Sequence, residues 1–285
     1  MEEYKFGRKS AQAKIVENCS STTGIAQVFK DYFSKTCVPN NTDLHSVHKD
    51  EFFKKFEKYP IFNESNHLFT TEDIEVALSK LKRGKAVGLD DLSVEHLIYA
   101  HPCLIISIKI LFNLMLLSGF VPEEFGTGLM IPILKESNAD AAVCDNYRGV
   151  TISCVVSKLF ENALLGKFGS FLSTDNLQFG FKKGVGCSDA LHTVRSVVNH
   201  FTKNGCTVTV SALDISKAFD RVSHFALLSK MIAHNFPKQL IGVLLSWYTK
   251  CSVKVKWKDV ISDSFQVHAG VRQGEFLAPC YLLST

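Results

Sequence analysis

The sequence has few of the features that mark a specialised class of protein. It contains no internal repeat and no low-complexity tract, and only 7 of its 285 residues are proline. Its 9 cysteines include no Cys-x-x-Cys pair, which argues against a zinc ribbon and against a secreted, disulfide-stapled domain. The N-terminus is acidic and polar, so we expect an intracellular protein, located in the cytoplasm, the nucleus or both.

A strong charge bias and a long uninterrupted apolar run are also lacking. The net charge is +4, and a content of 46% hydrophobic and 21% charged residues is typical of an ordinary globular protein. This charge permits an anionic partner without requiring one. The longest apolar stretch, residues 103–120, is interrupted by Lys109 and Asn113, so we expect a buried helix and no membrane partner. No obligate protein partner is evident.

Helical and strand patterns are interleaved along the chain, which predicts an α/β or α+β fold. Residues 1–69 are expected to form a partly disordered helical extension or linker, in which 38–68 give the weakest pattern. Helices are expected near residues 22–37, 70–85, 103–117, 156–164, 188–204, 224–235 and 238–249, and strands near 128–135, 206–215 and 252–259. Pro132 should confine its strand to an edge or a bulge. The helix at 188–204 should turn its apolar residues inward.

Asp214 stands at the end of an apolar, β-branched run, in "VSALDISKAFDRVSH". A desolvated carboxylate is costly unless a cation compensates it, and aspartate is depleted in strands. Capping of the next turn and binding of a metal ion are about equally good explanations of Asp214 alone. Asp220 follows a turn and is better explained as a helix cap. Phe219 is one of 22 phenylalanines and is more simply a core residue, unless a nucleotide pocket lies beside Asp214.

A second group of candidate residues lies in "AGVRQGEFLAP", residues 269–279, where Gly270 and Gly274 flank Gln273. The simplest explanation is a glycine-containing connection from a strand to a helix. The functional alternative is a binding loop, because glycine lets a backbone approach a ligand closely and glutamine offers both a donor and an acceptor.

Scattered cations form a third group. Lys135 ends "IPILK" and Arg148 lies in "DNYRGVT", and each alone would be taken as a surface cation. The stretch 80–85 adds four more cations, for which a solvated face is the default and a phosphate-binding patch the alternative. It is not a Walker loop, because no Lys-Ser/Thr follows its second glycine.

The segment "SVKVKWKD" alternates Lys254, Lys256 and Lys258 with apolar residues, which predicts a half-buried strand with one basic face. This face is a candidate contact for nucleic acid. His45 and His48 have helical i, i+3 spacing but no further ligand nearby in sequence, so a zinc site is not expected.

The order of these motifs resembles that of the reverse transcriptases of non-LTR, LINE-like retrotransposons. The landmarks in chain order are "RGKAVGLDDLSVEHL", "IPILK", "DNYRGVTIS", "SKLFE", "QFGFKKGVGCSDAL", "LDISKAFDRVSH" and "GVRQGEFLAP", and the resemblance covers roughly residues 70–283. It implies a right-hand polymerase fold with fingers and palm. Residues 70–115 would be its helical N-terminal extension, and 116–285 an incomplete polymerase domain.

The resemblance also implies roles for single residues. Asp214 matches the first catalytic aspartate on a palm strand, a ligand of Mg²⁺ or Mn²⁺. Phe219 matches the steric gate that excludes a ribose 2′-hydroxyl. The implied reaction is two-metal nucleotidyl transfer on an RNA template with a DNA primer. A metal ion would make the carboxylate of Asp214 tolerable at its strand end.

The implied binding site for the incoming dNTP draws on other motifs. Lys135 and Arg148 match the fingers cations that hold the triphosphate. Gln273 and Gly274 match the motif that packs beside the nascent base pair. Glu275 departs from the family pattern and adds a negative charge next to that motif.

The family's aromatic-Ala-Asp-Asp hairpin does not occur among the 285 residues, and no thumb is recognisable. We therefore expect a C-terminally truncated domain that does not polymerise as this chain alone. A non-catalytic nucleic-acid-binding remnant is the alternative function. A purely structural role ranks last, because it leaves the order of the motifs unexplained.

Overall fold

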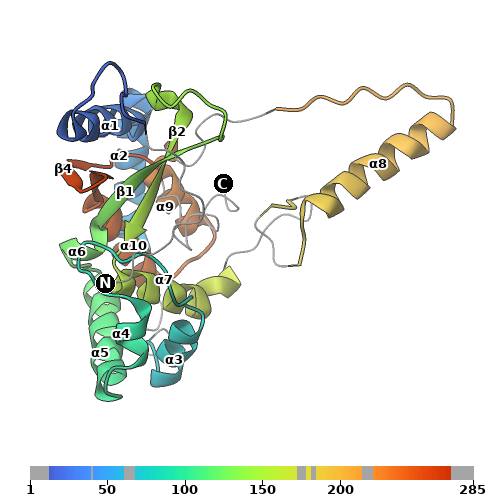
Figure 1. The fold of residues 1–285 in the computed structure, drawn as a ribbon. Coiled ribbons are helices and arrows are strands. Elements are labelled where there is room, and N and C mark those ends of the chain that lie inside the picture. The colour runs from blue at the N-terminus through green and yellow to red at the C-terminus, as the bar shows by residue number, and fades with distance from the viewer. Residues whose placement is uncertain are drawn as a thin grey trace.

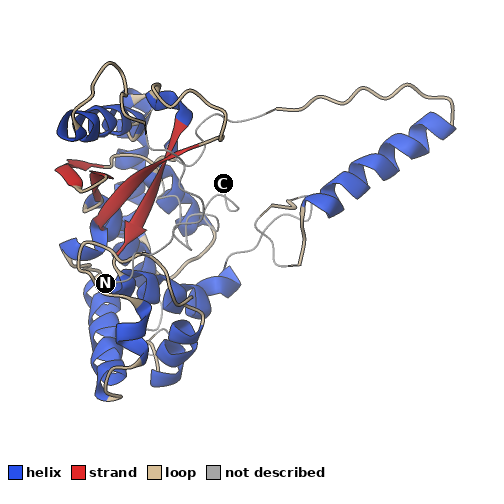
Figure 2. Cartoon of the chain, viewed as in Figure 1, coloured by secondary structure: helices blue, strands red, loops and turns tan. Residues whose placement is uncertain are grey.

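A four-stranded sheet organises the described part of the chain, and helices lie around it (Figure 1). The structure, a computed structural model, describes residues 13–39, 41–60, 68–171, 178–180, 184–213 and 221–270. The sheet has the order β2-β1-β3-β4, with β1 Thr127–Leu134, β2 Tyr147–Ser153, β3 Ser252–Trp257 and β4 Val260–Gln266. The expected mixture of helices and strands is confirmed (Figure 2).

Strand β1 is an inner strand, which corrects the edge position that its proline suggested. It pairs antiparallel with β2 from Gly128 to Leu134, and parallel with β3 over Thr127–Met130. Pro132 lies beyond the last residue that pairs with β3. No strand within the described ranges pairs with β1 on that side at Pro132, so the missing N–H removes no hydrogen bond from this sheet.

One face of the sheet packs on helix α1 (Thr22–Thr36). Val255 and Trp257 of β3 point to this face and are at most 1% exposed. The Phe29 ring of α1 lies against the rings of Tyr147 and Trp257, at centroid distances of 4.8 and 5.0 Å. The alternating pattern of β3 therefore has the expected buried side.

A second part of the core lies among helices, and aromatic side chains join these helices to one another. Phe160 is fully buried, and its ring centroid lies 4.6 Å from that of Phe112 and 5.7 Å from that of Trp247. Helix α3 begins with the expected Thr70–Asp73 capping box. The helices of this end are α3 (Thr71–Ser79), α4 (Val94–Ile98), α5 (Cys103–Ser118), α6 (Glu123–Gly126), α7 (Val155–Phe168) and α10 (Lys238–Thr249).

Helix α2 (Thr42–Lys58) is an element that the sequence pattern did not reveal. It packs against α9 (His224–Ala233), where the Phe52 ring lies 5.9 Å from the Phe225 ring. Phe52 is the one residue of α2 that is fully buried. A helix with so narrow a buried stripe has only a weak apolar periodicity, which explains why it was missed.

Helix α8 (Cys187–Lys203) forms where expected, but its apolar face does not turn inward. Leu191 is 64% exposed and Phe201 is 47% exposed, and Figure 1 shows α8 away from the sheet and its helices. The apolar stripe correctly predicted a helix, because spacing along the chain decides local structure. Burial depends on a partner surface, and the described residues supply none for α8.

The strand expected at 206–215 is not formed over its described part, residues 206–213. Val210 and Leu213 are 65% and 98% exposed there. β-Branched residues favour a strand only where a neighbouring strand accepts the backbone hydrogen bonds, and none of the strands in the described ranges does so here.

Helix α5 matches its expected range, but it is only half buried. Phe112 and Leu116 face the core, whereas Ile110 and Leu114 on the other side are 52% and 58% exposed. Gly119 ends the helix in the left-handed conformation, at φ 64°. Among the helices that the structure describes, none has the length and apolar content needed to span a bilayer.

Candidate functional site

Four of the predicted site residues lie outside the described residues: Asp214, Phe219, Gln273 and Gly274. The structure therefore bears on the cations of the site and on the segments that lead into the two motifs. Within the described ranges there is no group of three or more His, Cys, Asp or Glu side chains that could hold a metal ion.

The register of the β1–β2 hairpin brings Lys135 and Arg148 together. Arg148 pairs with Ile133, and the Lys135 N–H donates a 2.8 Å hydrogen bond to the carbonyl of Asn146. The two cations are thus diagonal neighbours on one face at one end of the hairpin, a relation that spaces Cα atoms by roughly 7–8 Å. The face they share is opposite to the one that packs on α1, because Tyr147 points to α1.

Lys254 and Lys256 of β3 lie on that same outer face of the sheet. Lys254 pairs with Leu129 of β1, which belongs to the set of alternate residues that includes Ile131 and Ile133. Both lysines are half-buried, whereas the valines between and before them are fully buried. We call this the cationic face: Arg148, Lys254 and Lys256 on strands β2 and β3, with the aliphatic side chains of β1 between them, and Lys135 at its end.

Lys258 is not part of the strand alternation, which corrects the sequence-based expectation. It occupies the tight turn between β3 and β4, at φ 53°, and its side chain is exposed. Trp257 and Val260 form the last pair before the turn, so the strand ends one residue before Lys258. The hairpin partner β4 was not predicted, although "VISDSFQV" carries a partial alternation that could have indicated it.

The cations of the outer face have no carboxylate partner within the described ranges. The ion pairs seen there join Lys55 to Glu51 and Lys167 to Asp73, both away from this face. The Lys135 amine donates instead to the backbone carbonyl of Asp145. The face is open at the Arg148 end, where Ile133 is 43% exposed, and buried at Leu129 beside Lys254. Positive charge without a carboxylate partner at the open end is suited to binding an anion.

The segments that lead into the two motifs outside the described residues meet at Gly270. The Gly270 N–H donates a 2.8 Å hydrogen bond to the carbonyl of Val222. The Gly270 carbonyl lies 2.6 Å from Nε2 of His224, which is 6% exposed. Val222 follows Asp220 by two positions, and Gly270 precedes Gln273 by three. Sequence reasoning had assigned His224 no role, because a single histidine at a helix start is unremarkable.

The basic stretch 80–85 has the solvated character that was its default interpretation. Lys80, Lys82, Arg83 and Lys85 are all exposed. The stretch is shaped by Glu95, whose carboxylate accepts a 2.7 Å hydrogen bond from the N–H of Gly84. This hydrogen bond, with others from the Glu95 backbone and Ser93, holds the pKa of the Glu95 carboxyl below its ordinary value.

His45 and His48 lie on one side of α2, close enough to His268 for its charge to act on His45, a proximity that the sequence could not reveal. Burial, followed by the charges of Lys49, His268 and His48, lowers the pKa of the His45 imidazole. Within the described ranges no group of three or more His, Cys, Asp or Glu side chains, this cluster included, could hold a metal ion.

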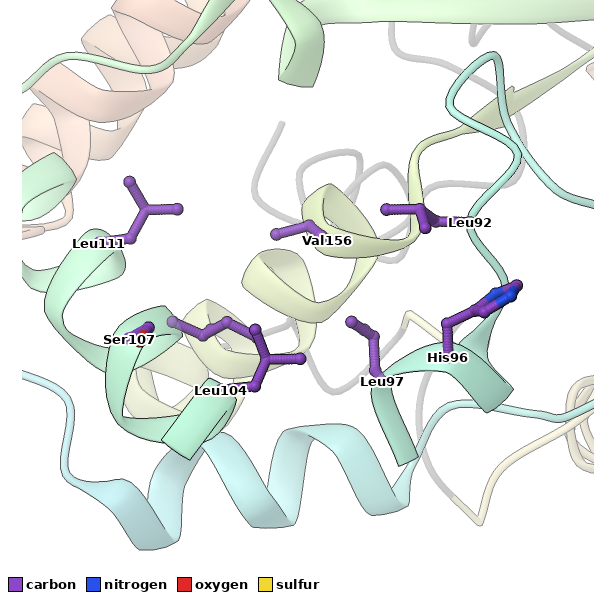
Figure 3. Close-up of a pocket in the computed structure, with 8 residues that line it drawn as sticks. Leu92, His96, Leu97, Leu104, Ser107, Leu111 and Val156 are labelled. Atoms are coloured by element: carbon purple, nitrogen blue, oxygen red, sulfur yellow. The ribbon is translucent and has the colours of Figure 1, made fainter. Parts of the chain in front are cut away.

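An apolar hollow of about 370 Å³ lies between α4, α5 and α7. Figure 3 shows Leu97, Leu104 and Val156 around it. None of the predicted site residues lines it. Its lining contains His96 but no lysine or arginine. The hollow is therefore separate from the cationic face.

Comparisons with known proteins agree with the order of motifs in the sequence. The model of the family "Reverse transcriptase (RNA-dependent DNA polymerase)" matches residues 133–283. The chain is 26% identical over 214 residues to the probable RNA-directed DNA polymerase from transposon BS of Drosophila melanogaster. It is 28% identical over 214 residues to the RNA-directed DNA polymerase from mobile element jockey of the same species. It is 29% identical over 181 residues to the probable RNA-directed DNA polymerase from transposon X-element.

These alignments cover most of this chain but a small share of each relative. They include 73%, 74% and 61% of the chain, and 23%, 23% and 20% of the respective relatives. The family match extends over more than half of the chain and includes Lys135, Arg148, Asp214 and Gln273. The chain therefore belongs to the reverse transcriptase (RNA-dependent DNA polymerase) family, as a reverse transcriptase domain of the non-LTR retrotransposon type.

Proposed function

We propose that this chain forms the nucleotide- and template-binding part of an intracellular RNA-directed DNA polymerase. Its partners are an RNA template, a DNA primer and a dNTP. The observation that carries the proposal is the placement of Lys135 and Arg148 as diagonal neighbours on the cationic face, without carboxylate partners in the described ranges. Two adjacent cations at the end of a rigid hairpin suit a triphosphate.

The chemistry of phosphoryl transfer explains why such cations matter. The reaction depends on in-line positioning and on neutralising charge that spreads over the phosphate oxygens. Arg148 can bind two phosphate oxygens at once through its planar guanidinium, and Lys135 adds a compact point charge. In this proposal the β1–β2 hairpin belongs to the fingers of a right-hand polymerase, and the segment that ends at Asp214 belongs to its palm.

The remaining roles in the proposal come from the likeness of motifs and concern residues outside the described ranges. Asp214 holds Mg²⁺ or Mn²⁺, and such an ion supplies neutralisation of phosphate charge. Phe219 excludes the 2′-hydroxyl of a ribonucleotide, and Gln273 with Gly274 packs beside the new base pair.

Lys254 and Lys256 are proposed to contact the phosphate backbone of the template–primer duplex. They lie on the same face as Arg148 but on the opposite side of β1. Backbone contacts of this kind contribute affinity without base specificity. They would position the duplex beside the triphosphate site.

Binding of a dNTP to a template–primer complex tests the proposal. The primer is a DNA strand with a 3′-dideoxy end, annealed to a longer RNA template, so that no turnover is required. Fluorescence anisotropy follows the dissociation of the labelled duplex with Mg²⁺ and either the complementary or a mismatched dNTP. We expect the complementary dNTP to slow dissociation, and Asp214→Asn to remove that effect while the duplex still binds.

Two other outcomes would contradict the proposal. Salt-sensitive duplex binding that ignores Mg²⁺ and dNTP would instead support a non-catalytic nucleic-acid-binding role. No binding of RNA or DNA at low salt would exclude both functions. Lys109→Gln is a control, because it removes one positive charge from α5, which packs on α3 and α10.

A further inference from the structure

A two-residue turn before α1 holds the loop that joins β1 to β2. Val16 and Cys19 exchange two backbone hydrogen bonds, of 3.0 and 2.8 Å, and Glu17 lies in the turn between them. The Glu17 N–H donates a 2.9 Å hydrogen bond to the carbonyl of Ala142, and the Glu17 carboxylate accepts one of 3.1 Å from the Cys144 N–H. Glu17 therefore holds the loop at two points, once through its backbone and once through its side chain.

The turn has an unfavourable residue at its first central position. Glu17 has φ 44° and Asn18 has φ 64°, so both lie in the left-handed region. Glycine adopts this region freely and asparagine is common there, whereas glutamate is not. The contact of the Glu17 carboxylate with Cys144 gives a reason for a glutamate at this strained position. Strain that the surrounding structure maintains is typical of functional contacts.

The part of the loop that Glu17 holds leads directly to Lys135. Cys144 begins a single turn of 3-10 helix, Cys144–Asn146. Two carbonyls at the other end of this turn hold Lys135. That of Asn146 accepts from the Lys135 N–H at 2.8 Å, and that of Asp145 accepts from the Lys135 amine. Because the turn is only three residues long, a shift at its start is passed on to both carbonyls.

Other hydrogen bonds of the loop stay within it. Asp140 accepts from the Ala142 N–H and from the Asn146 side chain, both at 2.9 Å. Such bonds give the loop its shape, but they do not fix its direction relative to the core. The bonds to Glu17 do so, because the neighbouring Val16 is fully buried and anchors the turn.

Resting on the proposed function, we propose that Glu17 is a positioning residue of the triphosphate site, which fixes the β1–β2 loop so that Lys135 stays beside Arg148. The sign of its effect separates this role from an effect of charge. If Glu17 acted through its negative charge alone, its removal would strengthen the binding of an anion at these cations. If it acts through its hydrogen bond to the loop, its removal weakens that binding, because the binding-competent loop is populated less.

Three variants at this position of the full chain test the sign. Glu17→Gln removes the charge and keeps an oxygen that can accept from the Cys144 N–H. Glu17→Ala removes both the charge and the acceptor. Glu17→Gly also removes both, but glycine adopts φ 44° without strain, so the turn itself is relieved. Glu51→Ala is the control, because it removes an exposed carboxylate from α2, where Glu51 lies 3.9 Å from Lys55.

Two affinities are measured: that of the dideoxy-terminated template–primer complex for the complementary dNTP, and that of the chain alone for inorganic tripolyphosphate. Arg148→Gln should remove most of the tripolyphosphate binding, which locates this probe on the cation pair. We expect Glu17→Ala and Glu17→Gly to weaken both kinds of binding by about two- to fivefold, because one hydrogen bond contributes about fivefold to an equilibrium. Glu17→Gln and Glu51→Ala should bind as tightly as the unaltered chain, or slightly more tightly.

Melting temperature and hydrogen exchange complete the set. Glu17→Gly should melt no lower than Glu17→Ala, because the turn loses its strain, and yet bind no better. Exchange of the Cys144 and Lys135 amides should be faster in both variants, since these amides report the two ends of the short helical turn.

Equal or tighter binding of both ligands in Glu17→Ala and Glu17→Gly would overturn the proposal. Recovery of affinity in Glu17→Gly would also overturn it, because that pattern reports strain in the turn and not the bond to Cys144. Unchanged exchange at the Lys135 amide in Glu17→Ala would overturn the link between Glu17 and Lys135, with or without a ligand. Absence of dNTP binding in the unaltered chain would instead refute the proposed function, and the tripolyphosphate and exchange measurements would still decide the role of Glu17.

Discussion

The Tyr32 hydroxyl of α1 donates a 2.6 Å hydrogen bond to the carboxylate of Asp145, in the loop that joins β1 to β2. The backbone carbonyl of the same Asp145 accepts from the Lys135 amine. Through Tyr32, helix α1 thus supports Asp145, the loop residue that also holds the Lys135 amine. Residues before the matched family region therefore contribute to the geometry of the proposed triphosphate site.

Replacing Tyr32 by Phe should loosen this support while leaving the ring in place. We expect the free energy of unfolding to fall by about 1 kcal/mol, the usual net contribution of a hydrogen bond, because this one is exposed to solvent. Affinity of the template–primer complex for dNTP should fall a few-fold. Urea unfolding and the anisotropy assay measure the two effects. An unchanged dNTP affinity would mean that the loop keeps Lys135 in place without Tyr32.

The two strand lysines should govern the salt dependence of duplex binding, and the turn lysine should not. Each phosphate contact contributes a slope of roughly 0.9 to the decrease of log affinity with log salt on B-form DNA. We expect Lys254→Gln with Lys256→Gln to reduce the slope for a template–primer duplex by about 2 units. Lys258→Gln is the control. It also removes one lysine charge, but from the β3–β4 turn, and should leave the slope nearly unchanged.

Equilibrium binding from about 50 to 200 mM salt, a range in which such contacts change affinity strongly, checks this prediction. If Lys258→Gln alters the slope as much as the double variant of Lys254 and Lys256, the β3–β4 turn contacts the duplex and the strand face is not the main contact. If no variant alters it, the cationic face is not the contact surface.

Asp73 should make the stability of α3 depend on pH. Burial alone raises the pKa of its carboxyl, but the Thr70 backbone N–H, the Lys167 ammonium and the Thr70 hydroxyl outweigh burial and lower it below 3.8. A lowered pKa in the folded state stabilises the protein above the ordinary pKa, and this stability is lost as the pH falls through the folded-state pKa. Asp73→Ala should cost about 1 kcal/mol at pH 7 and clearly less near pH 3.

Urea unfolding of the unaltered chain and the variant at both pH values measures that difference. Thr70→Ala serves as a comparison, because it removes the capping hydroxyl and keeps the 3.2 Å contact between Lys167 and Asp73. A cost for Asp73→Ala that is the same at pH 3 and pH 7 would show that the carboxylate charge is not responsible.

Two glycines that border the sheet should differ in their tolerance of a methyl group. A Cβ on Gly126 would collide with the backbone carbonyl of Lys250, whereas one on Gly149 would meet the side chain of Met130 at 2.5 Å. A backbone cannot move aside as a flexible methionine can. We expect Gly126→Ala to lower the unfolding free energy by about 2–3 kcal/mol and Gly149→Ala by less than about 1 kcal/mol. Thermal unfolding of both variants measures the two losses of stability. Equal losses would contradict the prediction.

The local elements were largely predictable from the sequence, because they depend on neighbours along the chain. Helix α10 has the predicted bounds Lys238–Thr249, and β3 starts at the predicted Ser252. The capping box at the start of α3 was predictable from the identities of Thr70 and Asp73 alone. Each of these features is decided within one or two turns of chain.

Features that depend on distant partners were not predictable in this way. The apolar stripe of α8 predicted its helical form but not its burial, and among the described strands none pairs with residues 206–213. At the candidate site, the sequence indicated Lys135 and Arg148 separately, and only strand register brought them side by side. The contact between His224 and Gly270 joins positions far apart in sequence and left no local pattern. The proposed domain division at residue 69 stays a prediction.

The bare aliphatic side of α5 has a practical consequence when it is considered together with the cationic face. Strongly hydrated anions such as sulfate favour contact between apolar surfaces, so they promote self-adhesion through residues such as Ile110 and Leu114. Low salt has a different disadvantage. Contaminating nucleic acids bind the lysines and arginine of the cationic face most tightly when little salt competes for the phosphates. Purification of this chain therefore has a window bounded on both sides, and moderate chloride without sulfate is the condition that lies inside it.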